Sequence, residues 1–199
     1  MPQGYGKAIL NDTQYEEVFN RMQALSKDRL VAYDAGRPLS TDDLAKLREA
    51  GNLVDLMDTY RPLMASYFFL SGKIHHVLGE DEIAEQMFRQ CVLGMDRQMA
   101  DQPQAAPILR ATGGEAAYQL SQLLFLRHDY KGALEQAQLA VLATPTDARY
   151  HVAVASALNE LRRTDEAKGE LTKALGFDPK NAQAASLLRL IQHSSQTGG

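Results

Sequence analysis

The sequence is poor in the residues that build disulfides, metal centres and membrane spans. It has one cysteine among 199 residues, and it has no tryptophan. A single cysteine forms neither an intramolecular disulfide nor a cysteine-based zinc site, which favours a reducing compartment. The longest apolar stretches, such as residues 123–126, are far shorter than the about 20 residues of a transmembrane helix. We therefore expect a cytoplasmic protein with no membrane insertion.

The chain also lacks an excess of positive charge. Its 21 Lys and Arg residues face 25 Asp and Glu residues, which leaves a formal net charge of −4. This balance excludes a nucleic-acid binder that works by broad neutralisation of phosphates. The first 18 residues have neither the apolar core of about seven residues nor the small-residue cleavage pattern of a secretory signal peptide, so we expect no leader.

Helical periodicity extends along the whole chain. Apolar residues recur three and four positions apart, and no segment alternates apolar and polar residues over the length of a strand. We expect a first helix from Thr13, because Thr13 and Glu16 have the spacing of a capping box, and its end at the break of residues 36–38. A second helix is expected from about Ser40, with two aspartates in its first turn.

The C-terminal half repeats itself at a fixed interval. Residues 130–147 align with residues 164–181, and residues 82–96 have the same spacing but lie 49 residues before the next copy. The 15 extra residues fall near residues 97–114, where two prolines and two glycines predict an irregular insertion. The matching positions are Ala84, Ala133 and Ala167; Phe88, Ala137 and Leu171; Cys91, Ala140 and Ala174; and Pro145 and Pro179.

This pattern resembles the tetratricopeptide repeat (TPR) family, whose units of about 34 residues pair two helices and close with a proline. The resemblance implies an all-α solenoid of antiparallel helix pairs over residues 61–193, ended by a capping helix. It places an N-terminal helical extension at residues 1–60 and a disordered tail at residues 194–199. The two N-terminal helices do not fit the repeat register. They can cap the repeats, mediate a homodimer, or fold back across the groove.

The repeat register predicts where helices pack closely. Gly72, Ser121 and Ala155 are expected to be small because the second helix of each pair approaches the first at these positions. Pro145 and Pro179 are expected to end the second helix of their units, since a helix cannot continue through proline without losing a hydrogen bond.

The sequence does not indicate an enzyme. It contains no phosphate-binding loop, dinucleotide fingerprint, zincin motif or nucleophile elbow. His75 and His76 are adjacent and point about 100° apart on a helix, so they do not share a metal ion. Cys91 fills a small-residue position and is expected to be buried. The glycines of residues 111–115 are interpreted as a hinge, because Glu115 would repel an anion there. We expect no catalytic residue, metal or cofactor.

In the family, the first helix of each unit lines a concave groove that binds the ligand. The groove-facing positions of the three units here hold Ser66, Phe69, Lys73 and His76; Glu115, Tyr118, Gln122 and Phe125; and Arg149, Val152, Ser156 and Asn159. Phe69, Tyr118, Phe125 and Val152 suit an extended peptide with hydrophobic anchors. The alternative is that these side chains are core residues beneath the N-terminal helices.

Some members of the family hold the C-terminal carboxylate of heat-shock chaperones with Lys, Asn and Arg side chains in the groove. The corresponding positions here do not form that clamp, because they hold Phe69, Lys73, Gln119, Arg149 and Ala153. The expected ligand is therefore a protein or peptide segment bound in another way.

The resulting functional hypothesis is a non-enzymatic adaptor or chaperone that binds a segment of a partner protein. In layout, the chain is similar to the TPR-type chaperones of bacterial type III secretion translocators. An alternative is a structural subunit that buries a whole partner domain in a stable multiprotein assembly. A third is an enzyme with an unrecognised site.

Overall fold

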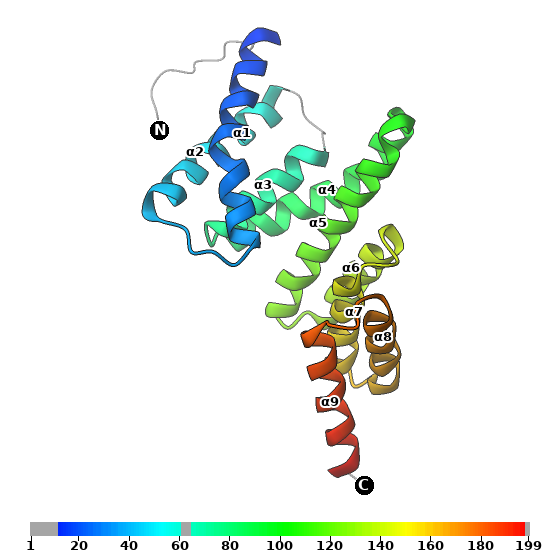
Figure 1. Cartoon of the computed structure of the whole chain (residues 1–199). Coiled ribbons are helices and arrows are strands. Elements are labelled where there is room, and N and C mark those ends of the chain that lie inside the picture. Colours follow the sequence, from blue (N-terminus) through cyan, green and yellow to red (C-terminus); the bar gives the residue numbers. More distant parts are fainter. Residues whose placement is uncertain (1–11, 61–64, 198–199) are drawn as a thin grey trace. The chain divides into compact units, whose positions relative to one another are not determined.

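A computed structural model describes residues 12–60 and 65–197 of the chain (Figure 1). Residues 1–11, 61–64 and 198–199 lie outside the described part. The beginning of the predicted N-terminal extension, the start of the predicted repeat domain and the end of the predicted tail fall on these residues. The described residues form nine α-helices and one short 3-10 helix, and they contain no strand. The prediction of an all-α fold is therefore confirmed.

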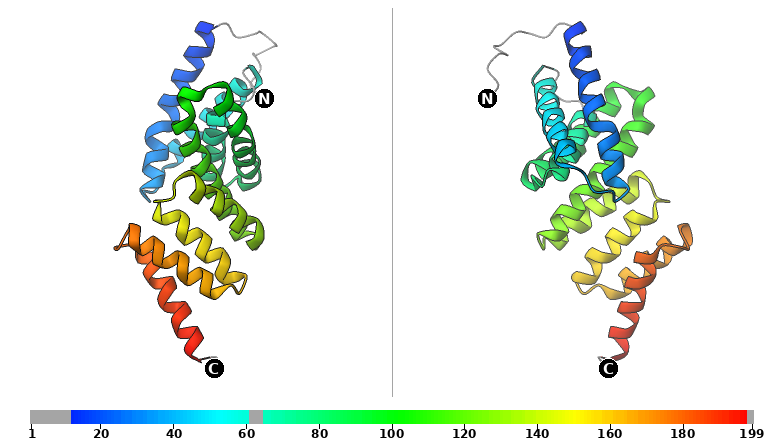
Figure 2. Two further views of the ribbon diagram at one scale, coloured as in Figure 1. Left: turned by 90° about the vertical axis from the view of Figure 1, so that its right-hand side faces the viewer. Right: turned by 60° about the vertical axis from the view of Figure 1, so that its left-hand side comes forward.

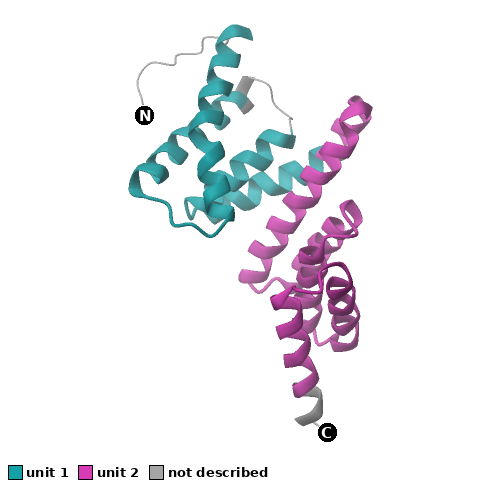
Figure 3. Ribbon diagram, in the orientation of Figure 1, with its two compact units in different colours: residues 1–94 teal, residues 95–199 magenta. Residues whose placement is uncertain are grey.

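The chain divides into two compact units, Met1–Gly94 and Met95–Gly199 (Figure 3). The boundary lies inside α4, so α3 groups with the two N-terminal helices. The predicted domain at residues 61–193 stays a prediction. Unit 1 contains α1 (Asp12–Asp34), α2 (Thr41–Tyr60), α3 (Ala65–Val77) and the first part of α4 (Asp81–Asp101). Unit 2 contains the end of α4, η1 (Pro103–Ala105), α5 (Ala106–Leu126), α6 (Tyr130–Ala143), α7 (Ala148–Glu160), α8 (Thr164–Phe177) and α9 (Ala182–Thr197).

The first two helices begin where their sequence signals lie. α1 starts at Asp12, one residue before the predicted Thr13, and α2 follows a capping box at Ser40. The Asp43 N–H donates to Ser40 Oγ over 3.1 Å, and the Ser40 N–H donates to the Asp43 carboxylate over 3.1 Å. Each side chain therefore accepts a hydrogen bond from the backbone N–H of the other residue, which fixes the start of α2.

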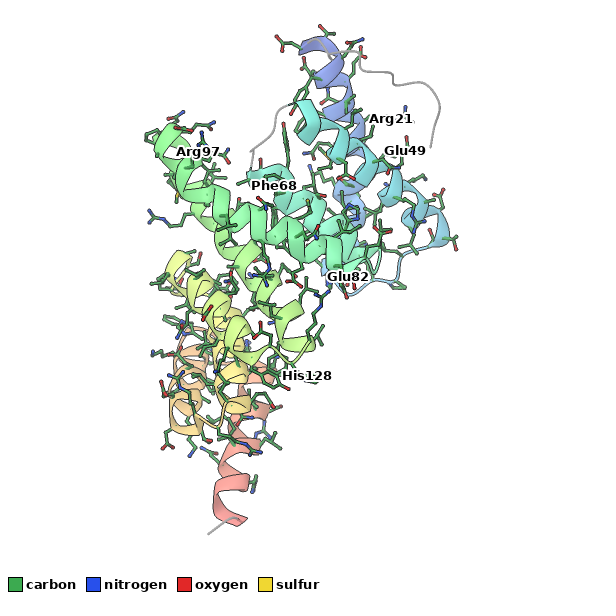
Figure 4. The ribbon with its side chains drawn as sticks, turned by 180° about the vertical axis from the view of Figure 1, so that it is seen from behind. Arg21, Glu49, Phe68, Glu82, Arg97 and His128 are labelled. Atoms are coloured by element: carbon green, nitrogen blue, oxygen red, sulfur yellow. The ribbon has the colours of Figure 1, made fainter. Side chains whose placement is uncertain are left out.

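The α1–α2 hairpin is a repeat-like pair that sequence reasoning did not find. Its second helix buries Ala50, Val54 and Met57, and these precede Ala84, Phe88 and Cys91 of α4 by one repeat interval. α1 packs on α2 and α3 as α5 packs on α6 and α7. Within unit 1 both helices pack on α3, while the roles expected for them, as a cap of the repeats, a homodimer contact or a cover of the groove, stay predictions. Arg21 of α1 and Glu49 of α2 form an ion pair across its surface (Figure 4).

The turns within the helix pairs share one backbone motif. In each turn a single residue has a positive φ, and the N–H of the next residue donates to a carbonyl five residues earlier, as in Arg163 to Leu158 over 2.9 Å. This is the Schellman arrangement that satisfies the last carbonyls of a helix. The positive-φ residues are Gly36 (70°), Gly79 (77°), His128 (62°) and Arg162 (61°). Their recurrence supports four related helix pairs.

In unit 2 the helices run antiparallel in succession (Figure 2). α6 and α8 each end two residues before a proline, at Pro145 and Pro179, as predicted. α5 contacts α7, and α7 contacts α9, so the first helices of successive pairs lie side by side. This arrangement brings their exposed faces together on one surface.

The predicted irregular insertion near residues 97–114 is mostly helical, so that prediction is wrong. α4 has 21 residues where α6 has 14, and α5 has 21 where α7 has 13, which accounts for the 15 extra residues. Position 96 is an aspartate where later units have proline, so α4 continues. Pro107 lies in the first turn of α5, where a missing N–H costs no hydrogen bond.

Two further expectations, a hinge near Gly114 and a disordered tail, are corrected by the structure. Gly114 is not a hinge but a buried position in α5, where a Cβ would lie 2.6 Å from the Ala143 Cβ of α6. The tail predicted from residue 194 is helical as far as Thr197. The reason is that residues 182–197 contain no glycine or proline, so nothing in the sequence ends α9 earlier.

The close crossing predicted at Gly72 is confirmed. A Cβ on Gly72 would lie 2.7 Å from two ring carbons of Phe88, which is itself fully buried. Ser121 and Ala155 are also buried, at 2% and 0% exposure. Small side chains at these three positions allow the two helices of each pair to approach.

Candidate functional site

The inner surface of unit 2 contains a small cavity, here called the α5–α7 cavity. Its volume is about 80 Å³. Six of the eight groove-facing residues predicted on α5 and α7 line it, and Glu115 and Asn159 are not among them. The lining residues are Tyr118, Ser121, Gln122, Phe125, Ala133, Arg149, Val152, Ala153, Ser156 and Gln183.

Helical spacing brings these side chains together. On α5, Tyr118, Gln122 and Phe125 follow one another at intervals of four and three residues, so they share one face. α7 presents its own face beside them because the two helices are in contact. Val152 is only 2% exposed and Ala153 8%, so they are mostly buried parts of the lining. Val152 is therefore less accessible than the predicted apolar strip requires.

Arg149 is held in place by carboxylates and aromatic rings of unit 2. Its Nη2 lies 2.7 Å from Asp147 Oδ2 and 3.0 Å from Glu115 Oε2. Its guanidinium carbon lies 5.3 Å from the ring centroids of both Tyr118 and Tyr150, within the range of cation–π attraction. The hydrogen bond with Asp147 is the main cause that raises the pKa of Arg149. This cation is thus already paired.

The surrounding network fixes the two tyrosines. The Tyr150 hydroxyl donates to Glu115 Oε2 over 2.8 Å, and the Tyr118 and Tyr150 rings lie 5.2 Å apart. Burial raises the pKa of both phenols, with the Glu115 carboxylate acting in the same direction. Both tyrosines therefore stay neutral, and one rim of the cavity is rigid and aromatic.

The uncommitted polar groups of the cavity are neutral. Among the described residues, the side-chain amides of Gln122 and Gln183 have no protein hydrogen-bond partner. Ser121 Oγ donates to the Tyr118 carbonyl over 2.7 Å, and Ser156 Oγ donates to the Val152 carbonyl over 2.9 Å. Both hydroxyl oxygens keep accepting capacity. The site can therefore donate and accept hydrogen bonds without offering a free charge.

Comparison with known proteins shows the fold. No family model matches the chain, and no curated protein matches its sequence. Among solved structures, MamA residues 41 to the end from Desulfovibrio magneticus RS-1 is 16% identical, with 89% of this chain and 86% of that chain covered and a TM-score of 0.59. MamA AMB-1 is 16% identical, with 89% and 84% covered and a TM-score of 0.58. The first TPR of Spaghetti (RPAP3), bound to an HSP90 peptide, covers 66% of this chain and 93% of its own, at 19% identity and a TM-score of 0.47.

The chain has a tetratricopeptide-repeat fold. The repeat register, the antiparallel pairs and the small residues at their crossings are the local reasons for it. In this TPR fold, α5, α7 and α9 are the inner helices of unit 2, and the α5–α7 cavity opens among them.

The TPR register also identifies a cavity residue that the sequence interpretation left out. Gln183 is the second residue of α9, as Arg149 is the second residue of α7, so the two occupy the same position of successive units. The capping helix thus continues the inner-helix pattern, and extending the register by one unit would have found Gln183. Ser121 and Ala133 were missed for another reason. They were assigned to helix crossings only, yet they also line the cavity.

The groove residues predicted in unit 1 have different surroundings. Ser66 is exposed, and the Phe69 ring lies 6.1 Å from the Phe88 ring. Lys73 pairs with Asp34 of α1. His76 Nδ1 lies 2.8 Å from Asp81 Oδ1, and its ring meets the edge of Tyr33.

Unit 1 has an open cavity of its own, with a volume of about 620 Å³. None of the predicted groove residues Ser66, Phe69, Lys73 and His76 lines it. The lining residues are Tyr33, Asp34, Gly36, Arg37, Pro38, Leu39, Leu44 and Val77.

The residues that suggested chemistry have structural environments. Burial raises the pKa of the Cys91 thiol to about 12, so it is not a reactive thiolate at neutral pH. His75 is buried, and its Nδ1 lies 2.6 Å from Glu80 Oε2. Within residues 12–60 and 65–197, no group of three or more His, Cys, Asp or Glu side chains is placed to hold a metal ion. No helix of these residues has the length and apolar character of a membrane span.

Proposed function

We propose that the chain is a non-enzymatic protein-interaction adaptor that holds a segment of a partner protein in the α5–α7 cavity. The observation that carries the proposal is the convergence of six register-predicted side chains on one cavity. Half-buried aromatic rings beside uncommitted amides are typical of a surface that binds a peptide through a few anchors and hydrogen bonds. The rigid Tyr118–Arg149–Tyr150 rim supports this use, because a preformed site loses little entropy on binding.

A chaperone role, including one in protein secretion, is a narrower form of the same proposal. It requires that the bound segment belongs to an unfolded partner, and it places the work of the protein in the cytoplasm. A homodimer formed through α1 and α2 is compatible with it. Exposed apolar side chains on α1, Val31 at 56% and Tyr33 at 40%, support such a contact.

The second candidate is a structural subunit of a stable multiprotein assembly. It is favoured by large apolar side chains that are exposed outside the cavity, at Leu93 (75%), Ile108 (73%) and Leu142 (74%). A structural subunit would bury these side chains against a partner domain, whereas an adaptor would use the cavity.

Site-specific photocrosslinking in native lysate distinguishes the two functions. A photoreactive phenylalanine analogue replaces Gln122 in the cavity, Gln138 on the exposed side of α6, or Leu142 near the end of α6. We expect position 122 to label a small set of proteins, each at one short segment, and position 138 to label none of them. Labelling from position 142 but not from position 122 would contradict the adaptor proposal and favour the structural subunit.

A further inference from the structure

We propose that the α5–α7 cavity binds an internal, uncharged segment of the partner chain and accommodates a serine, threonine or asparagine side chain of that segment. The cavity does not bind a C-terminal carboxylate. This inference rests on the proposed function, because it assigns the chemistry of the segment that the same cavity would bind. Three observations carry it: the pairing of the single cation, the two free amides, and the volume of the cavity.

The charge of the cavity disfavours a carboxylate. Among the described residues that line the cavity, Arg149 is the single charged one, and it pairs with both Asp147 and Glu115. One guanidinium with two carboxylates leaves a local excess of negative charge. A ligand carboxylate would have to displace one of them, and breaking a charge-assisted hydrogen bond is costly. Among the positions predicted to face the groove in unit 1, Lys73 is likewise paired, with Asp34.

The free hydrogen-bonding groups match a neutral polar ligand. Gln122 on α5 and Gln183 on α9 each offer an amide donor and a carbonyl acceptor, and neither has a partner in the described part of the chain. A peptide group, a hydroxyl or a carboxamide pairs with both kinds of group. An apolar side chain of the same size would leave the half-buried Gln122 amide unpaired in the complex, and a buried unpaired polar group is the basis of strong discrimination in polar sites.

The size of the cavity restricts the side chain. Its volume of about 80 Å³ is well below the roughly 300–1,000 Å³ of pockets that hold drug-sized ligands. Serine, threonine and asparagine side chains have two to four heavy atoms and fit this space. Ala133, Val152 and Ala153 give the lining an apolar part against which a threonine methyl packs. A small side chain therefore suits the cavity better than the ring of phenylalanine or tryptophan or the long side chain of arginine.

Selection from random peptide libraries by the full-length protein tests the inference. One library displays each peptide internally, between fixed flanking residues, and a second displays it with a free C-terminus. We expect enrichment from the internal library, with serine, threonine or asparagine at one fixed position and no acidic residue beside it. Replacing that residue with valine should weaken binding at least tenfold. Enrichment restricted to free C-termini, or of large apolar residues at that position, would overturn the inference.

Variants of the protein separate this inference from the proposed function. Q122L and Q183L should each weaken binding of an enriched peptide at least tenfold, whereas Q138L on α6 should leave it unchanged. If neither library yields a peptide whose binding depends on Phe125 or Gln122, the proposed function itself fails. If peptides depend on Phe125 but are unaffected by Q122L and Q183L, only the assigned chemistry fails.

Releasing Arg149 from its carboxylates provides a gain-of-function test. In the double variant E115Q/D147N, the asparagine can still accept the Arg149 backbone N–H as Asp147 does over 2.9 Å, so the start of α7 keeps its cap. We expect this variant to bind peptides with a free C-terminal carboxylate at least tenfold more tightly than the unmodified protein does. Unchanged affinity would overturn the assignment of carboxylate rejection to the pairing of Arg149.

Discussion

Replacing Gly72 with alanine adds one methyl group where α3 crosses α4 in unit 1. The new Cβ would lie 2.7 Å from two ring carbons of Phe88, whereas Cβ atoms in folded proteins essentially never come closer than 3.0 Å to another heavy atom. The Phe88 ring is 0% exposed, so it cannot move into solvent. Overpacking of this kind costs roughly 1–3 kcal/mol, and the higher helix propensity of alanine returns about 0.5–1 kcal/mol. We therefore expect a net loss of about 1 kcal/mol.

Gly94→Ala is the matched control in the same unit. No atom lies within 4 Å of the Cβ that would be added to Gly94 in α4, so alanine there should stabilise the chain by about 0.5–1 kcal/mol. Thermal unfolding followed by circular dichroism measures both variants. At about 2–4 °C per kcal/mol for a chain of this size, the two melting temperatures should move in opposite directions.

A double variant tests whether the Phe88 ring is the cause. Phe88→Leu removes the ring atoms that the alanine methyl would meet, so Gly72→Ala should be less costly in that background, with a coupling energy above about 0.5 kcal/mol. Equal melting temperatures for Gly72→Ala and Gly94→Ala would refute the assignment of a close crossing at Gly72.

Three further outcomes follow from the structure. Arg162→Gly should raise the free energy of unfolding by about 1 kcal/mol in urea titrations, because glycine adopts the positive φ of 61° without the cost of a Cβ. The Asp55 carboxylate, whose Oδ1 lies 3.9 Å from His75 Nε2, is the main cause that raises the pKa of His75 above 6.5, so the stabilising contribution of protonated His75 is present below pH 6.5 and is lost as the pH rises through the folded-state value. Urea unfolding across this window should show that decline in the unmodified protein and a flatter profile in His75→Gln. Iodoacetamide should label Cys91 at pH 8 only after unfolding, because burial raises the pKa of the thiol to about 12.

The sequence predicts the parts of the fold that depend on local signals. Alanines at the crossings recur in register from residue 133 onward, and prolines mark the ends of α6 and α8. The repeat register does not identify the N-terminal pair, α1 and α2. The loop of residues 35–40 is longer than the loop of residues 78–80 in the next pair, and this difference shifts α1 out of register. The segment near residues 97–114 misleads because proline in the first turn of a helix is as favourable as proline in a loop.

The candidate site was predictable as a set of positions but not as a chemical environment. Helical spacing and the repeat register were enough to bring Tyr118, Gln122 and Ser156 to one cavity. The state of Arg149 was not predictable, because its carboxylate partner Glu115 lies in the preceding repeat and meets it only through the packing of α5 against α7. That contact changes a free cation into a paired one.

The most direct test of the central claim uses a partner segment found by crosslinking or by library selection. Its affinity is measured for two full-length variants, each with one side chain shortened to alanine. Phe125→Ala removes a half-buried ring of the cavity, and Leu142→Ala removes a 74% exposed side chain outside it. Calorimetric titration should show a loss of about 2 kcal/mol, or roughly 30-fold in Kd, for Phe125→Ala and no change for Leu142→Ala, with both variants folded by circular dichroism. Equal affinities for the two variants, or a greater loss for Leu142→Ala, would contradict the claim that unit 2 binds its partner through the α5–α7 cavity.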